Sequence, residues 1–356
     1  MLNLNYLNIN IDKAREEHFH FFGCYVTKKI TGNQCVKTVT NSAHPDRPVL
    51  CKGSIVKSFT PKSGSLNTLK KFIFQKNRLK KVLIGSPIEL EKVNREFEVL
   101  VNRNFGAKTY ENYLKLSEKQ RPNFSNPNVH EFFQDINSIF NYDRLSKDNH
   151  YSSYKLTENL GVRSCVYCNR TYALTHRRAS GDRLMNPQLD HWFPQSKYPL
   201  LQVSFSNLIP SCEVCNSRVK SDTQFQLKEY FHPYQKEKEE INFRYKFSSG
   251  TNRYKIFFSD NSGKKVKKTC QEMFIDEMYD SHQYELDDLI KIRQAYSPKY
   301  LKNIKTSFPS ANLSDEEIYR LAFGTEIYKE EFHKRPFSKF KHDILIDLGI
   351  IKDGEN

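Results

Sequence analysis

The chain has 356 residues, of which 38% are hydrophobic and 27% charged, and its 26 Phe and 20 Tyr exclude a disordered or collagen-like protein. With 56 Lys and Arg against 41 Asp and Glu, the formal charge is +15, which points to a polyanionic partner. No stretch approaches the roughly 18 apolar residues that span a bilayer, and the first residues have no signal-peptide pattern. We therefore expect a cytoplasmic protein of two or three domains without membrane contact.

The positive charge is concentrated in two parts of the chain. Residues 1–95 hold 17 basic and 6 acidic side chains, a net charge of +11. Residues 161–235 hold 9 basic and 5 acidic side chains, a net charge of +4, and the remainder is balanced. These segments either contact a polyanion or carry surplus lysine as solvated surface, and composition alone leaves both interpretations open.

Apolar spacing and turn formers divide the sequence into four regions. Residues 1–86 are short apolar runs cut by turn formers and predict a basic, mixed or β-rich domain. Residues 87–160 have helical spacing, broken by RPNFSNPN. Residues 161–235 hold a cluster of Cys, His and Asn, and residues 236–356 predict a β-hairpin followed by helices. The predicted fold class is α+β.

Two local predictions in the last region are specific. The runs INFRYKF and RYKIFF alternate apolar and polar residues on either side of SSGTN, which predicts a hairpin with one apolar and one basic face. Ser314 and Glu317 have the spacing of a capping box and predict the start of a helix.

Two CxxC pairs enclose the central region. Cys165 and Cys168 form the first pair, Cys212 and Cys215 form the second, and 43 residues separate them. In a reducing compartment this pattern favours metal binding over disulfides, and four thiolates suit a tetrahedral Zn²⁺. A redox CxxC would need a βαβ setting that the sequence lacks. The sequence therefore predicts a structural zinc site.

Polar residues between and after the pairs follow a definite order. Asp190 and His191 precede a Pro-containing loop, Asn207 precedes an apolar run, and Asn216 and Lys220 follow the last cysteine. This order, over about 70 residues, resembles the HNH endonucleases that carry a zinc-binding ribbon. The resemblance implies a ββα-metal finger, with one strand ending in Asp190 and His191, a second starting at Asn207, and a helix opening near Asn216.

Phosphodiester hydrolysis needs a base for water and a cation for the developing charge. His191 is the candidate base, because an imidazole with a pKa of about 6.5 takes a proton at neutral pH. The resemblance implies that Asp190 and Asn216 bind the catalytic cation and that Asn207 braces the loop beside the base. Oxygen ligands suit Mg²⁺ or Mn²⁺. An isolated Asp-His pair is more often a surface or cap interaction, so the assignment depends on the whole pattern.

Several basic side chains are candidates for nucleic-acid contacts. Those after the last cysteine would hold a substrate phosphate, although a solvated helix face explains them nearly as well. Those between residues 70 and 81 are interleaved with apolar residues, which suits a helix with a basic face. The candidates are Lys71, Lys76, Arg78, Lys80, Arg218 and Lys220.

Large apolar residues near the motif have a simpler interpretation. We expect Trp192, Phe193 and Phe205 to form a small core beneath the finger rather than to stack on bases. His232 is expected to be a structural histidine rather than a further ligand.

The pattern as a whole predicts a metal-dependent DNA endonuclease acting on double-stranded DNA. The His-Pro-Tyr at 232–234 and the tail RPFSKFKHDIL at 335–345 resemble HNH subunits encoded beside an ATPase in bacterial anti-phage operons of the Septu type (PtuB-like). That resemblance implies a defence effector with an ATPase partner subunit. One rival is a modification-dependent or sequence-specific restriction enzyme, and another is a non-catalytic zinc-ribbon protein that binds DNA or docks a partner. One catalytic centre nicks one strand, so a double-strand break needs a homodimer, two nicks or a partner complex.

Overall fold

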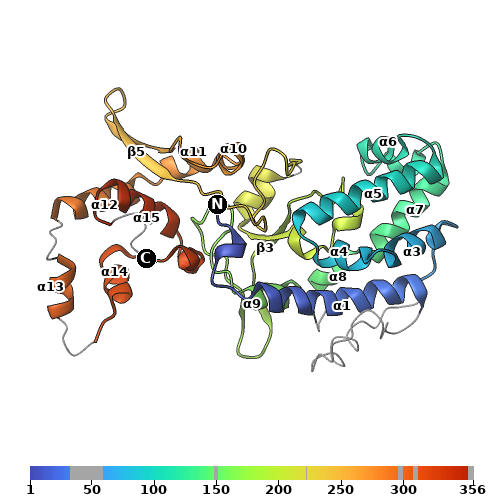
Figure 1. Cartoon of the computed structure of the whole chain (residues 1–356), viewed down its shortest axis with the longest axis horizontal. Coiled ribbons are helices and arrows are strands. Elements are labelled where there is room, and N and C mark those ends of the chain that lie inside the picture. Colours follow the sequence, from blue (N-terminus) through green and yellow to red (C-terminus); the bar gives the residue numbers. More distant parts are fainter. Residues whose placement is uncertain (33–58, 148–150, 222, 296–299, 308–311, 352–356) are drawn as a thin grey trace.

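The structure, a computed structural model, describes residues 1–32, 59–147, 151–221, 223–295, 300–307 and 312–351. The molecule is elongated, with the N-terminal helices at one end, strand β3 near the middle and the C-terminal helices at the other end (Figure 1). The described residues form helices and three two-stranded antiparallel sheets, so the fold is mixed α+β. No helix among them is long and apolar enough to cross a membrane.

The described part of residues 1–86 is helical, so the prediction of a mixed or β-rich domain is wrong there. Helix α1 spans Ile11–Thr31, and the shorter helices α3 (Leu66–Phe74) and α4 (Arg78–Ile84) pack against it. Helix α1 ends at Gly32, whose φ of 75° is the left-handed conformation of a helix C-cap. Most of the turn formers behind the strand prediction lie in residues 33–58, outside the described residues.

The helices predicted for residues 87–160 are present. The capping box of Ser86 and Glu89 starts the first of them, and the predicted break contains a short 3₁₀ turn, η2 (Arg121–Asn123). Buried aromatic residues of α5 and α7, including Phe97 and Phe132, pack together with ring centroids 6.3 Å apart. The helices are α5 (Pro87–Phe105), α6 (Thr109–Lys115), α7 (Pro127–Ile139), α8 (Tyr142–Lys147) and α9 (Ser153–Leu160).

The strands are short and pair in chain order. They are β1 (His176–Arg177), β2 (Arg183–Met185), β3 (Gln188–His191), β4 (Leu208–Ser211), β5 (Phe243–Ser248) and β6 (Arg253–Phe258). Strands β5 and β6 form the predicted hairpin, and Lys246 lies opposite Lys255 on its basic face. The sheet β3–β4 positions the candidate site.

The C-terminal region is mainly helical, as predicted. The capping box of Ser314 and Glu317 is present at the start of α14. The helices are α10 (Lys264–Glu272), α11 (Ile275–Asp280), α12 (Gln283–Ala295), α13 (Tyr300–Ser307), α14 (Asp315–Phe323) and α15 (Ser338–Asp347). The remaining short turns are η1 (Leu4–Tyr6), η3 (Pro199–Leu201), η4 (Phe205–Asn207), η5 (Val214–Lys220) and η7 (Lys329–Lys334).

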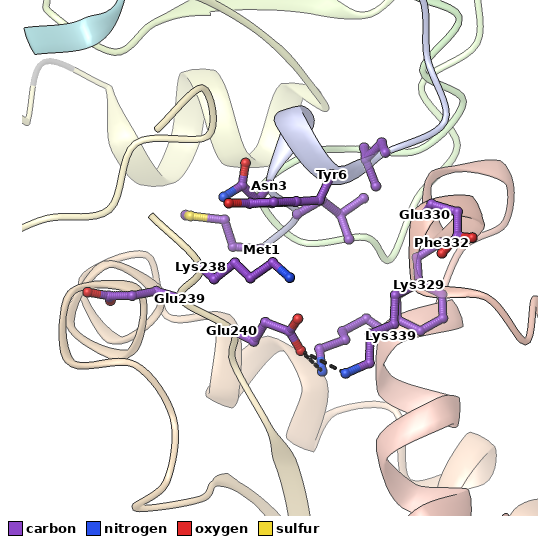
Figure 2. A pocket seen from close by; sticks show the side chains of 12 residues that line it. Met1, Asn3, Tyr6, Lys238, Glu239, Glu240, Lys329, Glu330, Phe332 and Lys339 are labelled. Atoms are coloured by element: carbon purple, nitrogen blue, oxygen red, sulfur yellow. Dashed lines mark hydrogen bonds and ion pairs between the residues drawn. The ribbon is translucent and has the colours of Figure 1, made fainter. Parts of the chain in front are cut away.

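The first residues join the centre to the C-terminal region. The amide of Leu4 donates to the carbonyl of Pro233 at 2.8 Å. The amide of Asn8 donates to the carbonyl of Glu330 at 2.9 Å. Figure 2 shows the pocket of about 290 Å³ beside this segment, where the Glu240 carboxylate faces two lysines. Those ion pairs, to Lys329 and Lys339, measure 3.2 and 3.8 Å. A continuous apolar cluster extends from α1 to α15, so most of the described elements share one core.

Candidate functional site

The four cysteines predicted to bind zinc lie together. Their sulfur atoms are all within 4.8 Å of one another, and a tetrahedral Zn²⁺ with bonds of about 2.3 Å separates its sulfurs by about 3.8 Å. The amide of Arg170 donates to Sγ of Cys168 at 3.4 Å, and the amide of Cys215 donates to Sγ of Cys212 at 3.5 Å. Hydrogen bonding with Cys165 lowers the pKa of Cys168 to about 7. This donor set fits a structural metal ion such as Zn²⁺.

Strands β3 and β4 bring the polar motif residues to one place. Asp190 lies opposite Ile209 and His191 lies opposite Leu208 in the antiparallel register. Because successive side chains of a strand point to opposite faces, Asp190 and His191 face different surroundings. The second strand starts at Leu208, one residue after Asn207, as the sequence predicts to within one position.

His191 is held as a neutral imidazole. Its Nε2 donates to the carbonyl of Gln202 at 2.8 Å, so Nδ1 is the unprotonated nitrogen, and the Gln195 amide donates to it at 3.0 Å. Tyr142 packs edge-on against the ring, with centroids 4.6 Å apart. Burial lowers the pKa of His191 to about 4, so the base form dominates at neutral pH.

Asn207 fixes the loop that follows His191. Its Oδ1 accepts from the amide of Phe193 at 2.7 Å, and its Nδ2 donates to the carbonyls of Phe193 and Leu201 at 3.1 and 2.9 Å. The side chain is fully buried. Its geometry is therefore that of the expected brace.

Asp190 is buried with two donors. The Tyr167 hydroxyl donates to Oδ2 at 2.5 Å and the Lys220 ammonium donates to Oδ1 at 3.1 Å. Burial raises the pKa of Tyr167 well above its ordinary value, so its hydroxyl keeps its proton. Burial also raises the pKa of Asp190, and the Lys220 charge opposes that rise. Each carboxylate oxygen thus accepts one hydrogen bond, and the Lys220 ammonium would repel a metal ion bound beside it.

Lys220 differs from its expected role. Its side chain is fully buried, and Nζ also donates to the main-chain carbonyl of His191 at 2.7 Å. A buried ammonium with these partners does not reach a substrate phosphate, so that prediction is wrong for this conformation. Arg218, on the same turn, is exposed and lies 4.0 Å from the Glu213 carboxylate.

A cavity of about 570 Å³ brings the motif residues together. Asp190, His191 and Asn216 line it, together with Gln188 and Gln195. Gln188 accepts hydrogen bonds from Nδ2 of Asn216 at 2.8 Å and from Oγ of Ser217 at 2.9 Å. Asn207 braces the loop from behind and is not part of the lining. The cavity is therefore lined by one candidate base, His191, and by side chains that carry oxygen atoms, among them Gln188 and Asn216.

The basic candidates outside the cavity divide into two groups. Lys71, Lys76 and Lys80 are exposed on or next to α3 and α4. Arg78 instead donates to the Glu96 carboxylate at 2.7 Å and to the carbonyl of Phe72 at 3.1 Å. Arg78 is thus paired within the protein through Nε and Nη1, and the phosphate contact expected of it stays a prediction.

The apolar residues near the motif take their predicted place. Trp192, Phe193 and Phe205 are buried, and His232 packs against Trp192 with centroids 4.5 Å apart. Nδ1 of His232 accepts from the amide of Tyr234 at 3.1 Å. His232 is thus a structural histidine, as predicted.

Four residues of the site escaped sequence reasoning. Tyr167 adjoins Cys168, Gln188 lies two residues before Asp190 and Gln195 lies four residues after His191, so nearness to a motif residue was an available signal. Tyr142 reaches the cavity through the fold, and no local pattern marks it. No family model matches the sequence, and comparison with curated proteins and with solved structures gives no significant match.

Proposed function

We propose that this protein is an endonuclease that hydrolyses phosphodiester bonds in DNA, with His191 as general base. The observation that carries the proposal is the state of His191, a neutral imidazole whose unprotonated Nδ1 meets Gln195 at the lining of a polar cavity. A base within hydrogen-bond reach of a bound water is the first requirement of hydrolysis.

The chain's own residues support one proton transfer. A water molecule that takes the place of the Gln195 amide at Nδ1 gives its proton to His191 as its oxygen attacks phosphorus. The bond from phosphorus to the leaving oxygen breaks, and that oxygen takes a proton from solvent. The Gln202 carbonyl accepts from Nε2 throughout and stabilises the imidazolium that forms.

The remaining site residues position the base. Asn207 fixes both ends of the loop after His191, and Tyr142 restricts the imidazole from one side. A divalent cation, which the HNH resemblance implies, would supply positive charge to the phosphate oxygens. The described conformation does not fit such an ion at Asp190, because the buried Lys220 ammonium lies 3.1 Å from Oδ1 and would repel it.

The experiment is incubation of the purified full chain with supercoiled plasmid, with and without Mg²⁺ or Mn²⁺. His191→Ala should abolish nicking and linearisation while zinc content stays unchanged, because the substitution removes the base and no sulfur ligand. Lys291→Ala, at an exposed position of α12, is the surface control and should cut nearly as well as the parent. Cleavage by His191→Ala at the parental rate would overturn the proposal.

A further inference from the structure

A short two-stranded ribbon, β1–β2, leads directly into the candidate site. Its strands pair antiparallel, and β2 ends at Met185, three residues before β3 begins at Gln188. Asn186 and Pro187, which join β2 to β3, line the cavity together with His191. The ribbon therefore starts at the edge of the cavity, and a partner that contacts it lies close to the candidate base.

One face of the ribbon packs against α9. Arg177 lies opposite Arg183, and their guanidinium carbons lie 5.1 and 5.6 Å from the centre of the Tyr154 ring. Nε of Arg177 also donates to the Glu158 carboxylate at 2.6 Å. These contacts hold the ribbon against the helix, so its position relative to the cavity is set by the fold.

The other face of the ribbon, called here its outer face, is exposed. Alternate residues of a strand share a face, so His176 and Arg178 lie on the side away from Arg177, and Met185 is paired with His176. All three of these outer side chains are exposed. Among the residues that the structure describes, no carboxylate pairs with Arg178. The outer face thus combines a cation with an apolar side chain, which suits the phosphates and base edges of a nucleic-acid groove.

A tight turn holds Arg178 at the tip of the ribbon. Its amide donates to the carbonyl of Asp182 at 2.9 Å, and its carbonyl accepts from the amide of Gly181 at 2.8 Å. Gly181 has a φ of 87°, a conformation that favours glycine. Between His176 and Met185, three arginines stand against one aspartate, which gives a net charge of +2. The tip therefore presents an ordered guanidinium with an excess of positive charge around it.

We propose that the ribbon β1–β2 is a DNA-binding arm, with its outer face in the major groove of a duplex and Arg178 against a backbone phosphate. This deepens the proposed endonuclease function and rests on it, because that function supplies DNA as the polyanion. The major groove is about 12 Å wide and admits a two-stranded ribbon. A guanidinium binds phosphate through paired, charge-assisted hydrogen bonds. Since the ribbon leads into β3, its docking brings the duplex backbone to the cavity that His191 lines.

The test measures how duplex binding depends on salt. Every sample is the full, zinc-loaded chain with His191→Ala, so that the DNA stays intact, and the anisotropy of a fluorescein-labelled duplex gives the affinity at each KCl concentration. One phosphate contact contributes about 0.9 to the slope of log affinity against log salt. Arg178→Ala should therefore lower this slope by about 0.9, and the affinity at about 0.1 M salt by about five- to tenfold. Arg178→Lys keeps the charge and should retain the slope.

Lys255→Ala is the matched control, since it removes one exposed cation from the other hairpin, β5–β6. Its slope should equal that of the His191→Ala protein. An unchanged slope in Arg178→Ala, an equal fall in Lys255→Ala, or no duplex binding at all would overturn the proposal. An equal loss of affinity for single-stranded DNA in Arg178→Ala would also overturn it, because a single strand has no groove for the ribbon.

Plasmid cleavage by the chain with His191 intact distinguishes this proposal from the function on which it rests. Cleavage that depends on His191, combined with an unchanged slope in Arg178→Ala, would overturn the arm alone. A lower slope in Arg178→Ala without any plasmid cleavage by the parent would overturn the nuclease and leave the ribbon as a DNA-binding arm.

Discussion

Asn207→Ala tests how the loop beside His191 is held. The substitution removes three hydrogen bonds in a fully buried place and leaves the amide and the carbonyl of Phe193 without partners, while the carbonyl of Leu201 keeps the amide of Ser204 at 3.2 Å. Each buried group left unsatisfied costs about 1 to 3 kcal/mol. Allowing for relaxation of the loop, we expect a loss of about 3 to 6 kcal/mol, a large share of the stability of a typical domain.

The protein supplies its own probe for this measurement. Trp192 is the only tryptophan of the chain, is fully buried and adjoins the loop that Asn207 holds. Its fluorescence during urea unfolding therefore reports the site itself. With a slope of about 2 kcal/mol per M, the transition midpoint should fall by roughly 2 M.

Asn216→Ala is the matched control for that experiment. Its amide makes an exposed hydrogen bond to Gln188, so its loss should cost less than about 1 kcal/mol. If Asn207→Ala unfolds at the same urea concentration as Asn216→Ala, the assignment of Asn207 as a brace would be wrong.

Three further outcomes follow from the structure. Metal analysis should find about one zinc per chain, and its removal by a chelator should unfold the region reported by tryptophan fluorescence, because the ion no longer ties the two CxxC segments together. Charge reversal at exposed Lys71, Lys76 and Lys80 should reduce the slope of log affinity for duplex DNA against log salt by up to about 3; an unchanged slope would make them solvated surface. Burial lowers the pKa of His18 and His191 to about 4, so both bind protons more readily when unfolded. Stability should be full above about pH 6.5 and fall towards pH 4, which urea midpoints measured against pH would show.

Much of the site could be predicted because its signals are local. The two CxxC pairs predict the cysteine cluster, and the alternating runs after residue 240 predict the hairpin, since spacing alone fixes which side chains share a face. The two strands that form β3 and β4 were instead expected from the HNH resemblance. Each CxxC pair and each alternating run is a pattern of neighbouring residues, although the two cysteine pairs that meet in the cluster are 43 residues apart.

The errors arose where distant contacts decide. The sequence predicts surface cations at Lys220 and Arg78. In the structure, Lys220 pairs with Asp190, 30 residues away in the sequence. Arg78 pairs with Glu96, 18 residues away in the sequence. In the N-terminal region, helix α1 has buried residues on most of its circumference. The alternation of apolar and polar residues with the helical period is therefore weak in its sequence. A helix that is buried all round lacks the polar face by which sequence patterns reveal helices.

The cysteine cluster and the cavity are connected through Asp190. Tyr167 lies between the two cysteines of the first pair, and Lys220 follows the second pair on the turn that Cys215 joins to the cluster. Both partners of Asp190 are thus positioned by the segments that the four sulfurs hold together. The amide of Val166 also donates to the carbonyl of Pro210 at 3.2 Å, which ties the first pair to strand β4. The cluster therefore sets the charge around Asp190 as well as the fold, because either segment, if released, would take a donor away from a buried carboxylate.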